Sequence, residues 1–151
     1  MNTPLKFKIK PFQELSINEL YSILQLRAEV FVVEQECAYQ DVDGKDKKAI
    51  HVVGLKNEKI IAYSRIFNAG DYFENASMGR IVVQKDERKY GYGHDLVKVS
   101  IEAIREHFKE STIKISAQTY LKDFYYSHGF HQTGNEYLED GIPHIAMIKT
   151  N

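Results

Sequence analysis

The sequence predicts a mixed α/β (α+β) fold built around one central sheet. Two observations support this prediction: β-rich runs alternate with helix-periodic runs along the chain, and the length suits one compact core. The chain has 151 residues, of which 43% are apolar and 27% are charged, close to the average for soluble globular domains. We therefore expect residues 1–151 to form a single domain.

The N-terminal part of the chain predicts a strand, a helix and a loop. "KFKIKPF" alternates charged and apolar residues, as a half-buried strand does, and reaches Pro11. Ser16 and Glu19 in "SINE" have the spacing of a capping box, which marks the start of a helix. Apolar residues then recur at helical spacing to about Val33. The polar stretch "EQECAYQDVDGKDKK" that follows predicts a long loop.

The remaining elements follow from the same two periodicities. "AIHVVGLK" and "IIAYSRIF" flank the turn signal "NEK" and predict an antiparallel hairpin, and "ASMGRIVV" predicts a third strand. The next helix has an apolar stripe made of Leu96, Val97, Ile101, Ile104 and Phe108. "TIKISA" predicts a strand, "LKDFYYSHGF" a short helix ended by Gly129, and the C-terminal part a hairpin that turns at "EDG". The predicted order is β-α-loop-β-β-β-α-β-α-β-β.

Composition and charge exclude several classes of function. A net charge of -1 gives no general attraction to nucleic acid or to anionic membranes. Cys37 is the one cysteine, so neither a disulfide nor a cysteine-based zinc site can form within the chain. No run reaches the roughly 18 apolar residues that a membrane span requires. We expect a cytoplasmic, soluble protein with no metal site and with neither nucleic acid nor membrane as a partner.

Two glycines lie between the predicted strand "ASMGRIVV" and the helix that follows it. Gly91 and Gly93 lie in "RKYGYGH", and a turn of this kind directs free N–H groups and the positive end of the helix dipole at one point. Such an arrangement binds anions. The P-loop and Rossmann patterns both fail here, because His94 and Leu96 stand where those motifs need Lys and Gly. Taken alone, the glycines are equally consistent with a tight turn that binds nothing.

A wider window resembles a known family. "IVVQKDERKYGYGHDLV" is similar to the acetyl-coenzyme A signature of the GNAT superfamily of N-acetyltransferases, with Lys85 in place of the usual proline and Lys89 in place of a common glycine. "FYYSHGF" resembles that family's second motif. The order of elements is also the GNAT order, and "LRAEVFVVEQECAYQDVDGKD" with "EDGIPHIAM" resembles the ElaA-like branch. The resemblance implies a central mixed, mostly antiparallel sheet flanked by helices.

The resemblance implies a cofactor and the residues that bind it. The cofactor is acetyl-CoA, with coenzyme A as product, and main-chain groups of Ile81, Val82 and Val83 would bind the pantetheine arm. Gln118 stands where many members of the family have asparagine. The guanidinium of Arg88 either adds positive charge or pairs with a surface carboxylate. The segment implied to cradle the pyrophosphate comprises Arg88, Lys89, Tyr90, Gly91, Tyr92, Gly93 and His94.

The resemblance also implies a mechanism of direct attack by an amine on the thioester. Tyr125 takes the position of the general acid that protonates the departing thiolate, and a strand amide near Val82 or Val83 would stabilise the oxyanion. Because a tyrosine has a reference pKa of about 10, it carries its proton at neutral pH. The alternative for Tyr125 is a packing aromatic between Phe124 and Tyr126.

The acceptor side is less well defined by the sequence. His51, His144 and Glu34 are candidates for the general base, with a hydrogen-bonded strand histidine or a surface carboxylate as the alternative. Arg65 and Arg80 either hold a substrate carboxylate or pair with loop acids. The loop "EQECAYQDVDGKDKK" is either an acidic rim that favours a cationic amine or a solvated charged segment. Its acids are Glu34, Glu36, Asp41, Asp43 and Asp46.

We expect an acetyl-CoA-dependent N-acetyltransferase that acts on a primary amine of a small molecule or peptide. A non-catalytic acyl-CoA-binding sensor or interaction domain is the alternative, and binding of another phosphate anion is a third possibility. The resemblance allows a homodimer, since dimers are common among GNAT relatives.

Overall fold

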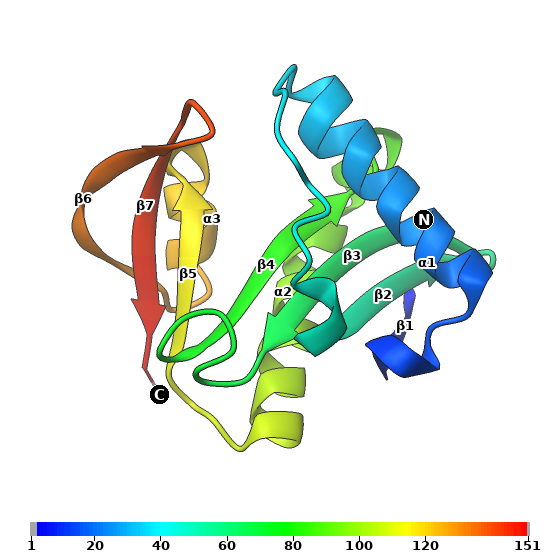
Figure 1. The fold of residues 1–151 in the computed structure, drawn as a ribbon, viewed down its shortest axis with the longest axis horizontal. Helices are drawn as coiled ribbons and strands as arrows, with labels where there is room; N and C mark the ends of the chain where they lie inside the picture. The colour runs from blue at the N-terminus through cyan, green and yellow to red at the C-terminus, as the bar shows by residue number, and fades with distance from the viewer. Residues whose placement is uncertain (1–2, 151) are drawn as a thin grey trace.

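The computed structural model describes residues 3–150 and contains one seven-stranded sheet, with strand order β1-β2-β3-β4-β5-β7-β6 (Figure 1). All neighbouring strands pair antiparallel except β4 and β5, which pair parallel. The predicted mixed, mostly antiparallel sheet flanked by helices is confirmed. The strands are β1 (Lys6–Pro11), β2 (Ile50–Lys56), β3 (Lys59–Phe67), β4 (Ala76–Val83), β5 (Ile113–Gln118), β6 (His131–Glu139) and β7 (Ile142–Lys149).

The first helix begins at the predicted capping box. The Ser16 side chain accepts a hydrogen bond from the Glu19 amide, and the Glu19 carboxylate accepts one from the Ser16 amide. Helix α1 spans Ile17–Arg27 and continues as a π-helical turn, Ala28–Glu34. The expected helix to about Val33 therefore exists, but its last part is wider than an α-helix, and π-turns of this kind are frequent at functional sites.

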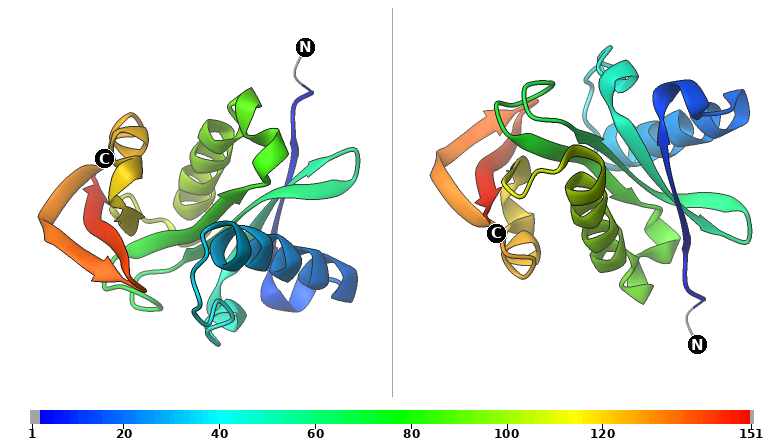
Figure 2. Two further views of the ribbon diagram at one scale, coloured as in Figure 1. Left: turned by 90° about the horizontal axis from the view of Figure 1, so that it is seen from above. Right: turned by 90° about the horizontal axis from the view of Figure 1, so that it is seen from below.

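Two further helices complete the fold. Helix α2 spans Tyr92–Phe108 and the short helix α3 spans Lys122–Tyr126. Helix α1 covers one face of the sheet, whereas α2 and α3 cover the other (Figure 2). The left-handed Gly129 (φ 94°) closes the turn after α3, as the sequence predicts.

The two faces of the sheet bury separate apolar clusters. On the α1 side, Ile23, Leu26 and Val30 pack against Val53, Tyr63 and Val82. On the other side, the α2 stripe with Leu96 and Ile104 packs on the central strands, and Phe130 is fully buried there. Because both faces of β3 and β4 are covered, these strands form the fixed centre of the molecule.

The sheet opens between β4 and β5. These strands pair only at Ala76–Ile113 and Ser77–Lys114, and they diverge beyond that point (Figure 1). On its other edge β4 carries a bulge, because Gly79 pairs with Arg65 and Val82 with Tyr63. Two residues of β4 thus oppose one of β3, and Arg80 adopts a left-handed conformation (φ 49°). Such bulges re-aim backbone and side chains next to functional sites.

Within residues 3–150, no helix is long and apolar enough to cross a membrane.

Candidate functional site

A cleft of about 490 Å³ lies where β4 and β5 separate, and we call it the central cleft. Its walls come from the π-helical turn, the end of β4, the start of α2, and α3. Ten of the residues predicted from sequence line it: Glu34, Ile81, Val82, Val83, Arg88, Gly91, Gly93, His94, Gln118 and Tyr125. Residues separated by more than 80 positions in the chain therefore meet in one cleft.

The start of α2 is open toward an incoming group. Gly91 precedes the helix in a left-handed conformation (φ 76°), and no side chain of residues 3–150 caps the helix N-terminus. Of the amides in this turn, that of His94 bonds back to the Gly91 carbonyl. A helix N-terminus without a side-chain cap presents donors to an anion. The donor set and the size of the cleft fit the pyrophosphate and pantetheine of a coenzyme A ester.

Two side-chain bridges cross the central cleft. Arg88 makes a bidentate ion pair with Glu34, at 2.6 and 2.8 Å, and its Nε donates to the Val83 carbonyl at 3.0 Å. This hydrogen-bonded ion pair lowers the pKa of Glu34. Gln35 and Gln118 form the second bridge, with amide contacts at 3.3 Å. Of the two alternatives for Arg88, pairing with a carboxylate is the one that the structure contains.

The other residues of the glycine segment do not line the cleft with their side chains. Tyr92 is buried in the core and its hydroxyl donates to the Thr3 carbonyl at 2.6 Å. The rings of Tyr90 and Tyr92 lie 5.5 Å apart, and the Lys89 ammonium lies over Tyr90. Any role of Lys89, Tyr90 and Tyr92 in binding would therefore fall to their backbone.

His94 lies at the cleft edge within a small aromatic cluster. Its Nδ1 is 2.9 Å from Nε2 of His128, and both rings contact Phe124. Burial, with neighbouring His94, Lys98 and Lys149, lowers the pKa of His128. His128 and Phe124 were not predicted as site residues, although both belong to the quoted motif "FYYSHGF".

Tyr125 is buried on α3, with 6% of its surface exposed. Its ring packs edge-on against Phe124 and Phe130, and its hydroxyl makes no hydrogen bond to any group in residues 3–150. Burial, with a smaller contribution from Tyr120, raises the pKa of Tyr125 above its ordinary value. The phenol is therefore a packing aromatic on the cleft wall, and its hydroxyl is protonated and makes no hydrogen bond within residues 3–150.

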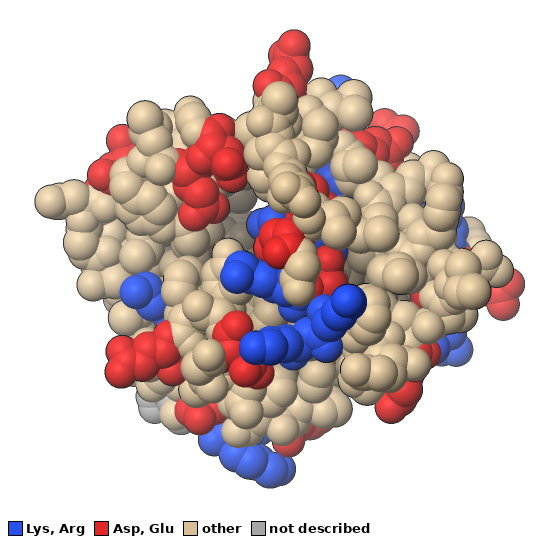
Figure 3. Space-filling model, viewed as in Figure 1, with Lys and Arg blue, Asp and Glu red and all other residues tan. Residues whose placement is uncertain are grey.

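A second, smaller pocket of about 110 Å³ adjoins the central cleft, and we call it the side pocket. Tyr125, Gln35 and Gln118 line both. The rest of its wall includes His144, Arg80, Ser116 and Glu139. On the face shown in Figure 3, a hollow separates the β5–β7 part from the rest, with acidic and basic side chains around it. Two adjoining chambers therefore share Tyr125 as a wall residue.

The aspartates of the long loop are not free to bind a substrate. Together with three arginines they form the ion-pair cluster, whose members are Arg27, Arg65, Arg80, Asp41, Asp43 and Asp46. Asp41 and Asp46 are 7% and 6% exposed, so this part of the loop is buried rather than solvated. Arg65 and Arg80 pair with these acids, the second of the two roles considered for them.

His51 lies beside the ion-pair cluster and lines neither chamber. Its Nδ1 is 2.6 Å from the Tyr63 hydroxyl and its Nε2 is 2.9 Å from the Asp46 carbonyl. Burial lowers the pKa of His51 despite the Asp46 carbonyl and carboxylate. His51 is a buried strand histidine with both ring nitrogens engaged.

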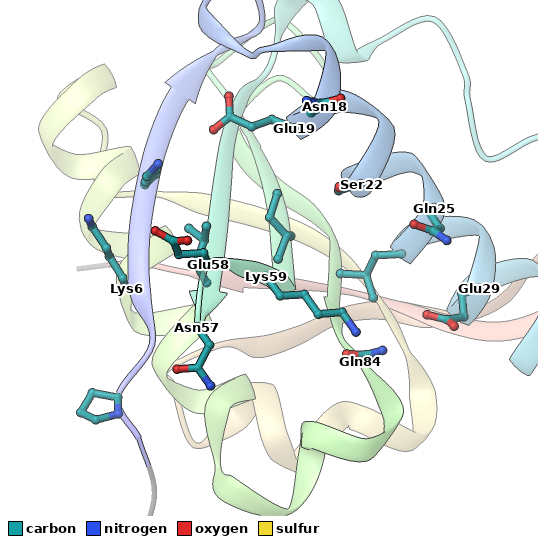
Figure 4. A pocket seen from close by; sticks show the side chains of 15 residues that line it. Lys6, Asn18, Glu19, Ser22, Gln25, Glu29, Asn57, Glu58, Lys59 and Gln84 are labelled. Carbon is teal, nitrogen blue, oxygen red and sulfur yellow. The ribbon is translucent and has the colours of Figure 1, made fainter.

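A third, wider groove lies beside α1, and none of the site residues predicted from sequence lines it. It measures about 750 Å³ and lies between α1, β1 and the β2–β3 turn (Figure 4). Side chains of both charges line it, among them Lys6, Lys59, Glu29 and Glu58.

Within the described part of the chain, no group of three or more His, Cys, Asp or Glu side chains could hold a metal ion.

Comparisons with known proteins agree with this geometry. Residues 16–151 match the profile of the family described as Acetyltransferase (GNAT) domain. The chain is 41% identical over 138 residues to the protein ElaA of Escherichia coli, covering 90% of each. The crystal structure of that protein superposes with a TM-score of 0.89 at 38% identity, covering 96% of this chain and 99% of the other. An acyl-CoA N-acyltransferase from Pseudomonas aeruginosa superposes with a TM-score of 0.91 at 36% identity, covering 97% and 100%.

Proposed function

The chain belongs to the GNAT acetyltransferase family, and from this premise we propose that it is an acetyl-CoA-dependent N-acetyltransferase acting on a primary amine. The amine attacks the acetyl group directly, and Tyr125 is the general acid. The position of Tyr125 is the observation that carries the proposal. It lines both the central cleft and the side pocket, so a thioester held in one chamber and an amine held in the other would both lie beside this residue.

The central cleft supplies the groups that would bind the cofactor. The uncapped amides of the α2 N-terminus would hold the pyrophosphate, and the opened edge of β4, at Ile81, Val82 and Val83, would hold the pantetheine arm through main-chain groups. Acetyl-CoA would supply the acetyl thioester. A β4 amide near Val82 or Val83 would stabilise charge on the carbonyl oxygen, a contribution of ~2.7–4 kcal/mol for a preorganised donor.

Tyr125 suits proton donation to the leaving sulfur. Burial raises its pKa, so the hydroxyl keeps its proton at neutral pH. The same dry surroundings disfavour a thiolate anion and make it a stronger base, so a weak acid can still protonate it. The role requires a hydroxyl with no competing partner, and the Tyr125 hydroxyl has none among residues 3–150.

A thiol-release assay with acetyl-CoA tests the proposal. The amines are polyamines, amino acids, aminoglycosides, and lysine or N-terminal peptides. Tyr125→Phe should lower kcat by roughly 100-fold or more, with binding of coenzyme A retained in a thermal-shift titration. Tyr126→Phe is the matched control, because Tyr126 is 58% exposed and lines neither chamber.

Cofactor binding without turnover of any amine would support the acyl-CoA sensor instead. Equal stabilisation by coenzyme A, free phosphate and other nucleotides would support a general anion site.

A further inference from the structure

The side pocket contains a histidine that the proposed reaction has not yet used. His144 lies on β7, between Gln118 of β5 and Tyr137 of β6 in the sheet register. It is 7% exposed and lines the side pocket together with Tyr125. A buried imidazole therefore faces the chamber next to the proposed acid.

The hydrogen bonds of His144 fix where its proton lies. Nδ1 is 2.7 Å from the Ile142 carbonyl, and because a carbonyl oxygen only accepts, Nδ1 must carry the hydrogen. The neutral ring then has its lone pair on Nε2. Within residues 3–150, the polar group recorded next to Nε2 is the Glu139 carboxylate, at 3.5 Å. A carboxylate cannot donate a hydrogen bond, so this contact becomes favourable when Nε2 gains a proton.

Glu139 is itself held in place. Its Oε1 accepts a hydrogen bond from the Ser116 hydroxyl at 3.0 Å, and Ser116 also bonds the Tyr137 hydroxyl. The Tyr137 ring stacks on His144, with centroids 6.2 Å apart. Groups from β5, β6 and β7 thus orient the imidazole and its carboxylate.

The other two candidates for the base lack these properties. Both ring nitrogens of His51 are engaged away from the chambers. Glu34 is held by two hydrogen bonds from Arg88.

Charged and titratable groups around His144 leave the side pocket acidic. Arg80 pairs with Asp41 and Asp43, so its charge is balanced, whereas within residues 3–150 neither Glu139 nor Asp140 at the β6–β7 turn pairs with a lysine or an arginine. Besides Glu139, the titratable groups that line the pocket or pack on His144 are Tyr125, Tyr137, Asp140, Cys37, Tyr39 and Arg80.

We infer that the side pocket receives the end of a slender aliphatic ammonium chain and that Nε2 of His144 takes its proton, with Glu139 stabilising the imidazolium. The inference rests on the proposed function and adds to it the base and the class of acceptor. The small volume of the pocket excludes bulky ring amines, since drug-sized ligands occupy about 300–1,000 Å³.

The proton balance of the reaction is complete with these two residues. Nε2 accepts one proton from the ammonium group, and the neutral nitrogen attacks the thioester carbon. The C–N bond forms, the C–S bond breaks, and Tyr125 gives its proton to sulfur. The second proton on the new amide nitrogen restores Tyr125, directly or through water. His144 then releases its proton to solvent, so the net reaction releases one proton.

His144→Gln and Glu139→Gln test the inference, with His131→Gln as the matched control. His131 is an exposed histidine of β6 that lines neither chamber. The kcat/KM of each protein is measured against pH with short alkylamines and lysine peptides. For the wild type and His131→Gln we expect kcat/KM to fall on the acid side of the profile, because a protonated imidazole cannot accept a proton. In His144→Gln the acid limb should disappear and kcat should fall by roughly 100-fold. Glu139→Gln should lower kcat by a smaller factor.

Two readouts do not depend on turnover. Nitrogen NMR of the free protein should show the His144 proton on Nδ1, and thermal-shift titration should show unchanged coenzyme A binding in all three variants. A proton on Nε2 would overturn the inference, as would a His144→Gln profile matching that of His131→Gln. Turnover of bulky ring amines in preference to alkylamines would overturn the acceptor class. Absence of turnover by the wild type would overturn the proposed function and this inference together.

Discussion

Removing the charge of Asp46 should destabilise the protein strongly. Oδ1 of Asp46 accepts hydrogen bonds from Arg27 at 2.8 Å and from Arg65 at 2.9 Å. Both arginines are buried, at 0% and 1% exposed. The ion-pair cluster contains three arginines and three aspartates, so Asp46→Asn leaves an unbalanced positive charge inside the protein.

The expected loss is about 3 kcal/mol. Breaking a buried ion pair from one side typically costs ~3–5 kcal/mol. The lower end applies because Arg27 keeps Asp41 and Arg65 keeps Asp43, and because the asparagine oxygen can still accept a hydrogen bond. For a chain of this length, 3 kcal/mol corresponds to a fall in Tm of about 6–12 °C.

The pH dependence gives an independent check. Burial raises the pKa of Asp46, but hydrogen bonds and ion pairs with Arg27 and Arg65 outweigh it, so the pKa lies below 3.8. The pKa of Asp43 is lowered for the same reasons, with Arg65 as the main partner. A lowered folded-state pKa means that the stabilisation is fully present above about pH 4 and is lost as the pH falls further. The gap between wild type and Asp46→Asn should therefore narrow below pH 4.

Urea denaturation of wild type, Asp46→Asn and Asp71→Asn measures the effect. Asp71 is exposed and makes no side-chain ion pair within residues 3–150, so its variant should change stability by less than about 0.5 kcal/mol. The double variant Asp46→Asn/Arg65→Met restores charge balance and should lose less than the sum of the single changes. If Asp46→Asn equals Asp71→Asn, or if the two changes are additive, the argument from buried charge is wrong.

Two other outcomes test separate parts of the structure. In Gly93→Ala the new Cβ lies 3.6 Å from the Phe124 ring, an ordinary contact, so stability should hold or rise by about 0.4–1 kcal/mol while the thermal shift with coenzyme A falls. Gly91→Ala, at φ 76°, should instead lower the free energy of unfolding by about 1–2 kcal/mol. If the two alanine variants lose coenzyme A binding equally and do not differ in stability, this contrast between the two glycines is wrong. Because burial lowers the pKa of His51 below 6.5, the unfolded chain binds a proton that the folded chain lacks. Stability should therefore fall as the pH drops below about 6.5. The fall should be less steep in His51→Gln than in the exposed control His107→Gln. Urea denaturation at several pH values measures both slopes.

Sequence patterns predicted the elements that depend on neighbours in the chain. The capping box at Ser16 and Glu19, the hairpin turn at "EDG" and the glycine turn before α2 all appear where expected. The end of the first helix was predicted less well, because helical spacing of apolar residues does not distinguish an α-helix from the π-helical turn Ala28–Glu34.

The ion-pair partners of the loop aspartates could not be predicted from local sequence patterns. Asp41, Asp43 and Asp46 lie in "DVDGKDKK", a largely polar stretch that suits a solvated loop or an acidic rim. Their partners Arg27, Arg65 and Arg80 come from α1, β3 and β4, and nothing in the spacing of the aspartates indicates those arginines.

By itself the sequence determined the order of strands and helices, the open helix start at Gly91 and Gly93, and, through its resemblance to GNAT proteins, the family. Only the tertiary structure decided which side chains meet. Insertion of β7 between β5 and β6 brings His144 beside Glu139 and Ser116 and onto the wall that Tyr125 shares. Hydrophobic period and turn chemistry act over a few residues, whereas the placement of His144 beside Ser116 and Tyr125 joins positions far apart in the chain and exists only once the sheet has formed.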